Sequence, residues 1–288
     1  MNATSKEVVE DPNARLEHDD HMRGMEHAKM TVECITRPFA SVARVMARID
    51  PSDPAPWRLP NLALRLQVET PAGQRPVTRI YTVRSYDESS GLIEIDFVIH
   101  EDESPAMNWL ARAQPGTVIG YTGPRPHFVP AWEGGRKVAL FADETAIPAV
   151  YSILQNWQAG IEGVAYIETA DRAAFDEMPA VEGVSLNLLL RGADEAPGTT
   201  GRLVAAAKAI PDPAGWTVWV SGERQESRAI RRHFSETCEL PKEDVRATGY
   251  WRRGVSSSEV DRMRLRHYEE VISQGGGLRE FEDLDVQI

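Results

Sequence analysis

The chain has 288 residues and a formal net charge of −12, with 42% hydrophobic and 26% charged residues. This length suggests about two domains, and the composition excludes a chain that is disordered throughout. The excess of acid disfavours a nucleic-acid binder, which needs lysine and arginine to neutralise phosphates. Apolar runs stop well short of the ~18 residues of a membrane span, no apolar leader is present, and Cys34 and Cys238 are too few for a disulfide framework. We therefore expect a cytoplasmic protein without membrane insertion that acts as a monomer.

Residues 1–28 are charged and show no sustained hydrophobic period, which predicts a mobile tail. This tail contains His18, His21 and His27. Because no carboxylate or thiolate joins them at fixed helical spacing, a solvated tail is favoured over a metal site.

In residues 29–133, turn-forming proline, glycine, aspartate and serine separate short apolar runs, a pattern typical of an all-β domain. Alternating apolar and polar residues predict strands at residues 62–68, 80–84 and 92–100. Closing such strands into an antiparallel barrel removes their exposed edges. One helix is expected to begin near Pro105.

Residues 134–254 alternate between strand-like and helix-like segments. Strands are predicted at residues 137–142, 164–168, 184–190, 216–221 and 245–251, and helices at 143–158, 200–209 and 223–237, with a short one after residue 168. This alternation implies a doubly wound parallel sheet, which binds ligands at the carboxyl ends of its strands. Residues 255–288 are expected to form a helix at 257–273, a triple-glycine hinge at 275–277 and an acidic tail, which either frays or folds back near the cleft between the domains.

Residues 79–84 combine three side-chain types that a flavin requires. A bound flavin needs an aromatic wall for its ring, a hydroxyl or amide donor near N5, and guanidinium groups for its phosphates. On a strand, Arg79, Tyr81 and Val83 project to one side and Thr82 and Arg84 to the other, unless a bulge merges the two sets. An ordinary barrel strand with solvent-facing arginines would explain the same composition.

The segment after residue 103 predicts a capped helix. Ser104 is suited to the N-cap and Pro105 to the first helical position, so free N–H groups and the helix dipole could meet a pyrophosphate. The alternative is a structural helix whose Trp109 and Leu110 fill the floor of the barrel.

The second domain lacks a glycine-rich phosphate loop after its first strand. Asp143 and Glu144 instead open the next helix, where acidic residues stabilise the dipole and repel a phosphate. A dinucleotide must therefore lie differently from its Rossmann pose. Residues 221–223 end the fourth strand, where a nicotinamide is expected. The arginines of the following helix form a solvated face, from which one or two could meet the 2′-phosphate of NADPH.

Together these segments resemble the siderophore-interacting protein family, which comprises flavin-dependent ferric-siderophore reductases with a ferredoxin-reductase-like fold. The matching pieces are RIYTVR at residues 79–84, IDFVIH at 95–100, SPAMNWLARAQPG at 104–116, GPR at 123–125, ADETAIPA at 142–149, SGE at 221–223 and GYWRRG at 249–254. Their order and spacing make the resemblance more specific than any one of them.

The resemblance implies an FAD-binding barrel followed by a domain that binds NADPH or NADH. It places Arg79, Tyr81, Thr82, Val83 and Arg84 on the flavin ring and phosphates, Asp96, Val98 and His100 on the ribose and adenine side, and Pro105, Ala106 and Met107 on the pyrophosphate. Further cofactor contacts are implied for Asp143, Thr145, Ala146, Gly222, Glu223 and Trp251, and contacts to an anionic ferric chelate for Arg252 and Arg253. Ser104 and Met107 stand where the family usually has Gly and Ser or Thr, which implies an altered or weaker flavin site.

The implied reaction assigns the redox chemistry to the flavin. A nicotinamide donates two electrons as hydride, Fe(III) accepts one, and a flavin can divide the pair. Reduction to Fe(II) weakens a chelate of hard oxygen donors. No protein acid, base, nucleophile or metal ligand is required, and Cys34, Cys238 and His233 are interpreted as structural. Two alternatives stay open, namely an NAD(P)H–flavin reductase or electron-transfer component serving another acceptor, and a non-catalytic siderophore-binding module.

Overall fold

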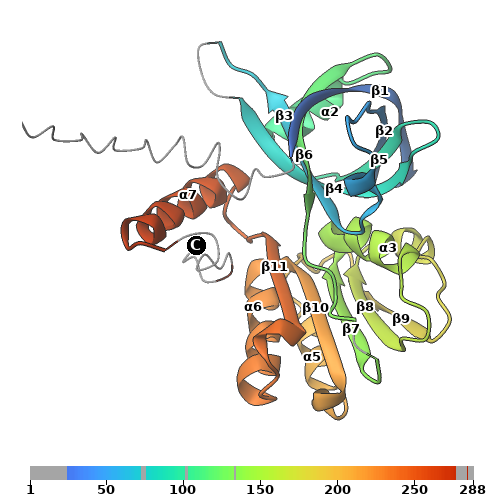
Figure 1. Cartoon of the computed structure of the whole chain (residues 1–288), viewed down its shortest axis with the longest axis vertical. Helices are drawn as coiled ribbons and strands as arrows, with labels where there is room; N and C mark the ends of the chain where they lie inside the picture. Colours follow the sequence, from blue (N-terminus) through green and yellow to red (C-terminus); the bar gives the residue numbers. More distant parts are fainter. Residues whose placement is uncertain (1–24, 73–75, 101–102, 133, 277–283, 285–288) are drawn as a thin grey trace, which may run out of the picture.

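The computed structural model describes residues 25–72, 76–100, 103–132, 134–276 and 284. Figure 1 shows a barrel above an open sheet, with a long C-terminal helix to one side. The six strands of the barrel are β1 (Glu26–Phe39), β2 (Val42–Arg48), β3 (Leu62–Glu69), β4 (Val77–Asp87), β5 (Leu92–Val98) and β6 (Val118–Pro126). They close in the order β1-β2-β5-β4-β3-β6, so no strand edge is left open.

The barrel core follows from period-two patterning. Leu64, Leu66 and Val68 of β3 are buried, whereas the intervening residues are half-exposed. Helix α2 (Pro105–Arg112) lies between β5 and β6 in the chain and adds Trp109 to this core, and the short η2 (Ala55–Arg58) adds Trp57. The predicted strands and the helix at Pro105 are confirmed, although β5 ends at Val98 rather than at residue 100. Strand β1 begins at Glu26, within the range expected to be a tail, and residues 1–24 lie outside the described part of the chain.

The second domain is the predicted parallel sheet. Its strands β7 (Lys137–Asp143), β8 (Gly163–Thr169), β9 (Val184–Leu190), β10 (Trp216–Glu223) and β11 (Val245–Trp251) are ordered β11-β10-β7-β8-β9. The helical segments are η3 (Glu144–Ala146), α3 (Ile147–Gln155), α4 (Arg172–Asp176), α5 (Arg202–Lys208), η4 (Pro213–Gly215), α6 (Arg224–Arg232), the π-helical η5 (His233–Thr237) and η6 (Lys242–Asp244).

Both faces of this sheet are covered. Leu140 of β7 packs in a cluster with Ile153 of α3, and its neighbour Phe141 packs in another with Leu203 of α5. Because successive strand residues point to opposite faces, this division confirms a doubly wound sheet. The helix predicted at 143–158 begins as the turn η3 and ends at Gln155, and the one predicted at 223–237 changes to a π-helix after Arg232.

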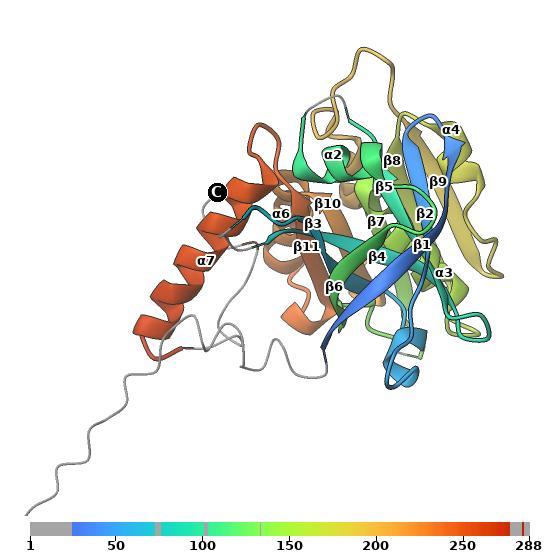
Figure 2. The ribbon, with the colours of Figure 1, turned by 90° about the horizontal axis from the view of Figure 1, so that it is seen from above.

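Helix α7 (Ser257–Ser273) follows the sheet and begins with a capping box between Ser256 and Glu259. Figure 2 places α7 on the opposite side of the molecule from α3. Leu284, the described residue of the C-terminal tail, is 2% exposed, and its carbonyl accepts a hydrogen bond from Arg228. The other tail residues, including the carboxylates considered for a fold-back over the cleft, lie outside the described residues.

Among the described residues, none of the helices is both long and apolar enough to cross a membrane.

Candidate functional site

Strand β4 lies on the boundary between the barrel and the second domain. At one end, Arg79 donates to the Ser258 hydroxyl of α7 over 2.8 Å. Further along, the Thr82 and Ser221 hydroxyls lie within hydrogen-bonding reach of Tyr250 on β11, while burial raises the pKa of Tyr250 to about 12. At the other end, the Arg84 guanidinium lies 3.5 Å from the centre of the Tyr151 ring on α3. The strand that carries the predicted flavin motif is therefore also one that the second domain contacts.

Tyr81 of β4 begins a row of aromatic rings that ends on α2. Its ring centre lies 4.1 Å from that of Phe97, which in turn lies 5.5 Å from that of Trp109. Burial raises the pKa of Tyr81, so its hydroxyl stays protonated at any physiological pH. Part of the side chain remains accessible, as an aromatic wall for a planar ligand requires.

Arg79 offers an uncompensated positive charge beside this ring. Its guanidinium donates to the Thr78 carbonyl and to the Ser258 hydroxyl, both neutral acceptors. No carboxylate forms an ion pair with Arg79 among the residues that the structure describes. A half-buried cation with only neutral partners fits an anionic group, and the residues present here fit the phosphates of a flavin dinucleotide.

The N-terminus of α2 is built as expected. The Ser104 hydroxyl accepts from Met107 N over 3.2 Å, and the Ser104 carbonyl accepts from Asn108 N over 2.8 Å. Pro105 carries no N–H, so Ala106 is the one residue among the first three of the helix whose N–H is not used by the cap. Met107 packs against the barrel core. Val98 is half-buried at the end of β5, and His100 beyond it is exposed.

Arg84 and Asp96, which the resemblance places on the cofactor, have carboxylate and guanidinium partners within the protein. Arg84 is 1% exposed and forms ion pairs with Asp96 at 3.4 Å and with Glu177 at 2.5 Å. Arg44 of β2 binds the same two carboxylates, at 2.7 Å for Asp96 and 2.8 Å for Glu177. Burial lowers the pKa of Arg84, although Asp96 and Glu177 partly offset this effect. The terminal nitrogens of Arg84 are thus engaged by carboxylates, while its Nε has no hydrogen-bond partner among the described residues.

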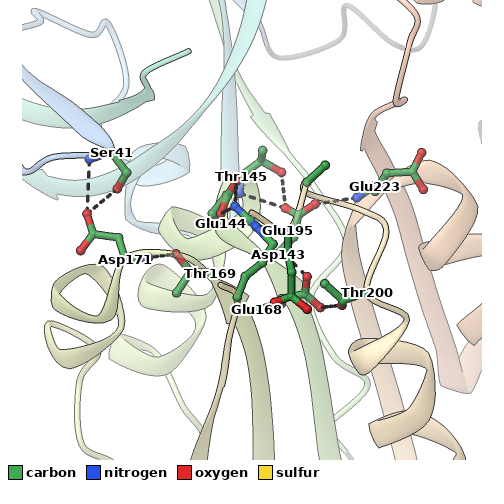
Figure 3. A network of polar contacts seen from close by, with 12 residues as sticks. Ser41, Asp143, Glu144, Thr145, Glu168, Thr169, Asp171, Glu195, Thr200 and Glu223 are labelled. Carbon is green, nitrogen blue, oxygen red and sulfur yellow. Dashed lines mark hydrogen bonds and ion pairs between the residues drawn. The ribbon is translucent and has the colours of Figure 1, made fainter. Parts of the chain in front are cut away.

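We call these four residues, Arg44, Arg84, Asp96 and Glu177, the interdomain ion network. Glu177 follows α4 in the second domain, while the other three lie on barrel strands. A second polar contact lies nearby, where the N–H and hydroxyl of Ser41 donate to Asp171 over 3.3 and 2.8 Å (Figure 3). Ion pairs and hydrogen bonds thus connect the barrel to the second domain on the α4 side.

The carboxyl ends of the parallel strands carry a cluster of acidic side chains (Figure 3). Asp143 ends β7, Glu168 lies near the end of β8, and Glu223 ends β10. The Glu168 carboxylate accepts from the Thr200 hydroxyl over 2.7 Å, and Glu144 binds Arg191 at 2.7 Å. Both acids are satisfied within the protein.

Glu223 and Glu226 stand at the start of α6. Glu223 caps this helix by accepting from Gln225 N at 2.6 Å and Glu226 N at 3.0 Å. Neither oxygen of Glu226 accepts a side-chain hydrogen bond from the described residues. Burial, together with the carboxylates of Glu168, Asp143 and Glu223, raises the pKa of Glu226 to about 7. Glu226 is therefore partly protonated at neutral pH.

Trp251 covers these strand ends, and a tight turn follows it. Its indole N–H donates to Asp143 over 2.7 Å. Arg252 pairs with Val255 in an isolated antiparallel bridge, and Arg253 N donates to Glu223 over 3.2 Å. The two arginines assigned to an anionic substrate thus lie on the turn that leads from the sheet edge to α7.

Three contributors to this region were missed by the sequence-based analysis. Tyr151 and Glu177 meet β4 from elements far away in the chain, and Ser258 does so from α7. No spacing rule relates these residues to Arg79 or Arg84, so the sequence holds no local signal for them.

Comparison with known proteins agrees with this geometry. A family model described as siderophore-interacting protein matches residues 135–254, and one described as siderophore-interacting FAD-binding domain matches residues 43–128. A protein named ferric acinetobactin reductase, from Acinetobacter baumannii, is 44% identical over 271 residues, which cover 94% of each chain.

Two solved structures extend the comparison. The siderophore-interacting protein from Acinetobacter baumannii superposes with a TM-score of 0.83 at 44% identity, covering 87% of this chain and 99% of the other. A ferredoxin reductase of carbazole 1,9a-dioxygenase superposes with a TM-score of 0.62 at 14% identity, covering 79% and 70% of the two chains, and this likeness concerns the fold alone. The expected barrel and parallel sheet are therefore an arrangement found in known reductases.

Proposed function

Because the chain belongs to the siderophore-interacting protein family, we propose that it is an FAD-dependent ferric-siderophore reductase that passes electrons from NADH or NADPH to Fe(III) and so releases Fe(II). The observation that carries this proposal is the 44% identity to a ferric acinetobactin reductase along 94% of both chains. The fold supports it, since a barrel with the flavin motif on β4 stands against a parallel sheet whose strand ends face that motif.

The residues that would hold FAD lie along β4, β5 and α2. Tyr81 would form the wall for the flavin ring, Thr82 would offer its hydroxyl, and Arg79 would neutralise phosphate charge with its uncompensated guanidinium. Ala106 N–H, with Pro105 and Met107 beside it, would face the pyrophosphate, and Val98 and His100 the ribose and adenine side. We assign Arg84 and Asp96 to the support of this strand, because both are already paired in the interdomain ion network.

The residues at the strand ends suggest where the electron donor and the electron acceptor would bind. A bound FAD would supply the redox chemistry that couples a two-electron nicotinamide donor to a one-electron ferric acceptor. Thr145, Ala146, Gly222, Glu223 and Trp251 would border the nicotinamide. The carboxylates at these strand ends would repel a phosphate group placed beside them. Arg252 and Arg253 would attract an anionic ferric chelate, and the protein needs no nucleophile of its own.

The test begins with the visible spectrum of the purified protein. Flavin bands near about 375 and 450 nm are expected, as for protein-bound flavins in general. Anaerobic bleaching by NADH or NADPH should follow, and a ferric siderophore should restore the bands while a ferrous-iron chelator reports Fe(II). A colourless protein that does not take up added FAD would favour the binding module. If free FMN restores the bleached bands and no ferric chelate does, the result would favour the flavin reductase.

Size and location belong to the same proposal. We expect a monomer, which sedimentation of the flavin-loaded protein would report as a mass near the 32.1 kDa of one chain. We expect it to act in the cytoplasm, where the nicotinamide donors are found.

A further inference from the structure

The carboxylate of Asp143 has no capacity left for a ligand. Its Oδ1 accepts from Thr145 N at 2.9 Å and from the Thr145 hydroxyl at 2.5 Å. Its Oδ2 accepts from Glu223 N at 2.7 Å and from the Trp251 indole N–H at 2.7 Å. A carboxylate has about four acceptor positions, and four protein donors fill them. Asp143 is also 2% exposed, so a cofactor could not approach it without displacing one of these donors.

These donors come from three different strand ends. Thr145 follows β7 and Glu223 ends β10 (Figure 3), and Trp251 ends β11, the neighbour of β10 in the sheet (Figure 1). The regular pairing of β10 with β11 shifts register between Gly222 and Glu223, where the N–H of Glu223 donates to Asp143. The carboxylate therefore holds together a part of the sheet edge that the ladder alone does not define.

Two glycines allow this close approach. A Cβ on Gly222 would lie 2.6 Å from the Asp143 carboxyl carbon, and Gly222 has a φ of +150°, which other residues rarely adopt. A Cβ on Gly198 would lie 3.4 Å from the far edge of the Trp251 ring and 2.7 Å from the Glu223 side chain. The indole is thus held at its N–H by Asp143 and packed near its opposite edge by the Gly198 backbone.

We propose that Asp143 is a positioning residue that touches neither FAD nor nicotinamide, and that it acts by fixing Trp251 and the Gly222–Glu223 end of β10 in the orientation that electron transfer requires. The inference rests on the proposed function, because that function places the nicotinamide at these strand ends. It replaces the direct cofactor contact that the family resemblance implies for Asp143.

The energetics agree with a positioning role. Burying a carboxylate without a cation is costly, and burial raises the pKa of Asp143 above its ordinary value even though its hydrogen bonds act in the opposite direction. Hydrogen bonds to an ionised acceptor are about twice as strong as neutral ones. Four hydrogen bonds recover part of the desolvation cost and give an edge with little freedom, which is the condition for holding reacting groups within a fraction of an ångström.

The primary variants are Asp143→Asn and Trp251→Phe. An asparagine keeps the shape but replaces one acceptor oxygen by an NH2 group, which must face either the Thr145 donors or the Glu223 and Trp251 donors. Trp251→Phe keeps an aromatic ring and removes only the indole donor, so it preserves the test if Asp143→Asn fails to fold.

Asp244→Asn is the matched control. Asp244 is a buried acid that precedes β11 at the opposite end of the sheet, and it pairs with Arg136 at 2.8 Å. Its loss should destabilise the protein without disturbing the strand ends where the ligands meet.

The first readout needs no cofactor. In the ¹H–¹⁵N spectrum of the apoprotein, the Trp251 indole resonance is identified by its absence in Trp251→Phe. We expect it to move upfield in Asp143→Asn and to stay in place in Asp244→Asn, because only the former replaces the carboxyl group that accepts the indole N–H. An unmoved resonance in Asp143→Asn overturns the proposal even if the protein has no reductase activity.

The second readout uses the flavin-loaded protein. For Asp143→Asn and Trp251→Phe we expect FAD affinity within about threefold of the wild type and anaerobic bleaching by the nicotinamide roughly ten- to hundredfold slower. The double variant should be no slower than Asp143→Asn, because both changes act through one contact. The Asp244→Asn rate should stay within about twofold of the wild type.

The outcomes separate the two proposals. FAD affinity weakened more than about tenfold by Asp143→Asn would mean that Asp143 binds the cofactor. Equal slowing by Asp244→Asn would mean that the rate follows stability. If the wild type binds FAD but neither nicotinamide bleaches it, the donor assignment fails, and the indole resonance still decides the role of Asp143.

Discussion

The interdomain ion network makes a quantitative prediction for Glu177→Gln. The Glu177 carboxylate bonds to both terminal nitrogens of Arg44 at 2.8 Å and to Arg84 at 2.5 Å. Neutralising it leaves two guanidinium groups to share Asp96, and one of these groups, Arg84, has a side chain that is only 1% exposed. Removing one partner of a fully buried ion pair costs about 3 to 5 kcal/mol.

Solvent reduces that cost here. The Glu177 side chain is 34% exposed, so we expect a loss of about 2 kcal/mol from the free energy of unfolding. For a chain of this length each kcal/mol corresponds to roughly 2 to 4 °C, which gives a fall in Tm of about 4 to 8 °C. The control is Glu88→Gln, because Glu88 binds Arg58 at 2.6 Å with side chains that are 43% and 59% exposed. We expect less than about 1 kcal/mol for this surface pair.

The assay is thermal unfolding of the apoprotein at pH 7 and at acid pH. The hydrogen bond from Arg44, followed by the nearby charge of Arg84, lowers the pKa of Glu177 in the folded state. The contribution of Glu177 is therefore fully present above its unfolded pKa of about 4.3 and is lost as the pH falls through the lower folded value. The difference in Tm between wild type and variant should shrink in that acid range. Equal losses for Glu177→Gln and Glu88→Gln, or a difference independent of pH, would refute the reasoning.

Three further predictions follow from neighbouring contacts. Arg79→Ala should weaken FAD binding by about ten- to hundredfold with little change in Tm, whereas Arg84→Ala should chiefly lower Tm. The reason is that, of these two arginines, Arg84 has carboxylate partners and Arg79 has none among the described residues, and fluorescence titration and calorimetry measure the two effects separately. Burial raises the folded pKa of Glu226 to about 7, so between about pH 4.3 and 7 the folded state binds more protons than the unfolded state and the wild type loses stability as the pH rises. Glu226→Gln should remove this loss, and denaturant titrations at several pH values should show a variant more stable by on the order of 1 to 3 kcal/mol at pH 8. A pH dependence of stability that is the same in variant and wild type contradicts this. Ser104→Ala should lower the free energy of unfolding by about 1 kcal/mol through loss of the N-cap of α2, with Ser104→Gly costing only a few tenths.

The sequence predicted the architecture well because the architecture is set by local pattern. The period-two alternation in β3 and the apolar run of β7 each identify a strand, and Ser104 with Pro105 identifies the start of α2. The boundaries that differ are decided by tertiary contacts. Asp143 turns the start of α3 into a short 3-10 turn because its carboxylate is engaged with Thr145 and the neighbouring strands.

The site was predictable in part, and the reason is topological. Arg79, Tyr81 and Thr82 follow one another on β4, so their grouping is visible in the sequence. The partners that fix Arg84 come from β5, α3 and the segment after α4, and only the folded chain brings them together. A side chain that looks like a free phosphate ligand in the sequence can therefore already be neutralised in the fold.

The turn between β11 and α7 is fastened at both ends. Trp251 is bonded to Asp143 at the start, Ser258 to Arg79 at the finish, and the bridge between Arg252 and Val255 closes the middle. The backbone path of this segment is therefore set by contacts at its two ends and by the bridge between them, and Arg252 and Arg253 lie within it. Grafting the corresponding stretch from a relative, with Trp251 and Ser258 kept, would thus change the side chains of this segment while leaving its two anchoring contacts and both domains in place.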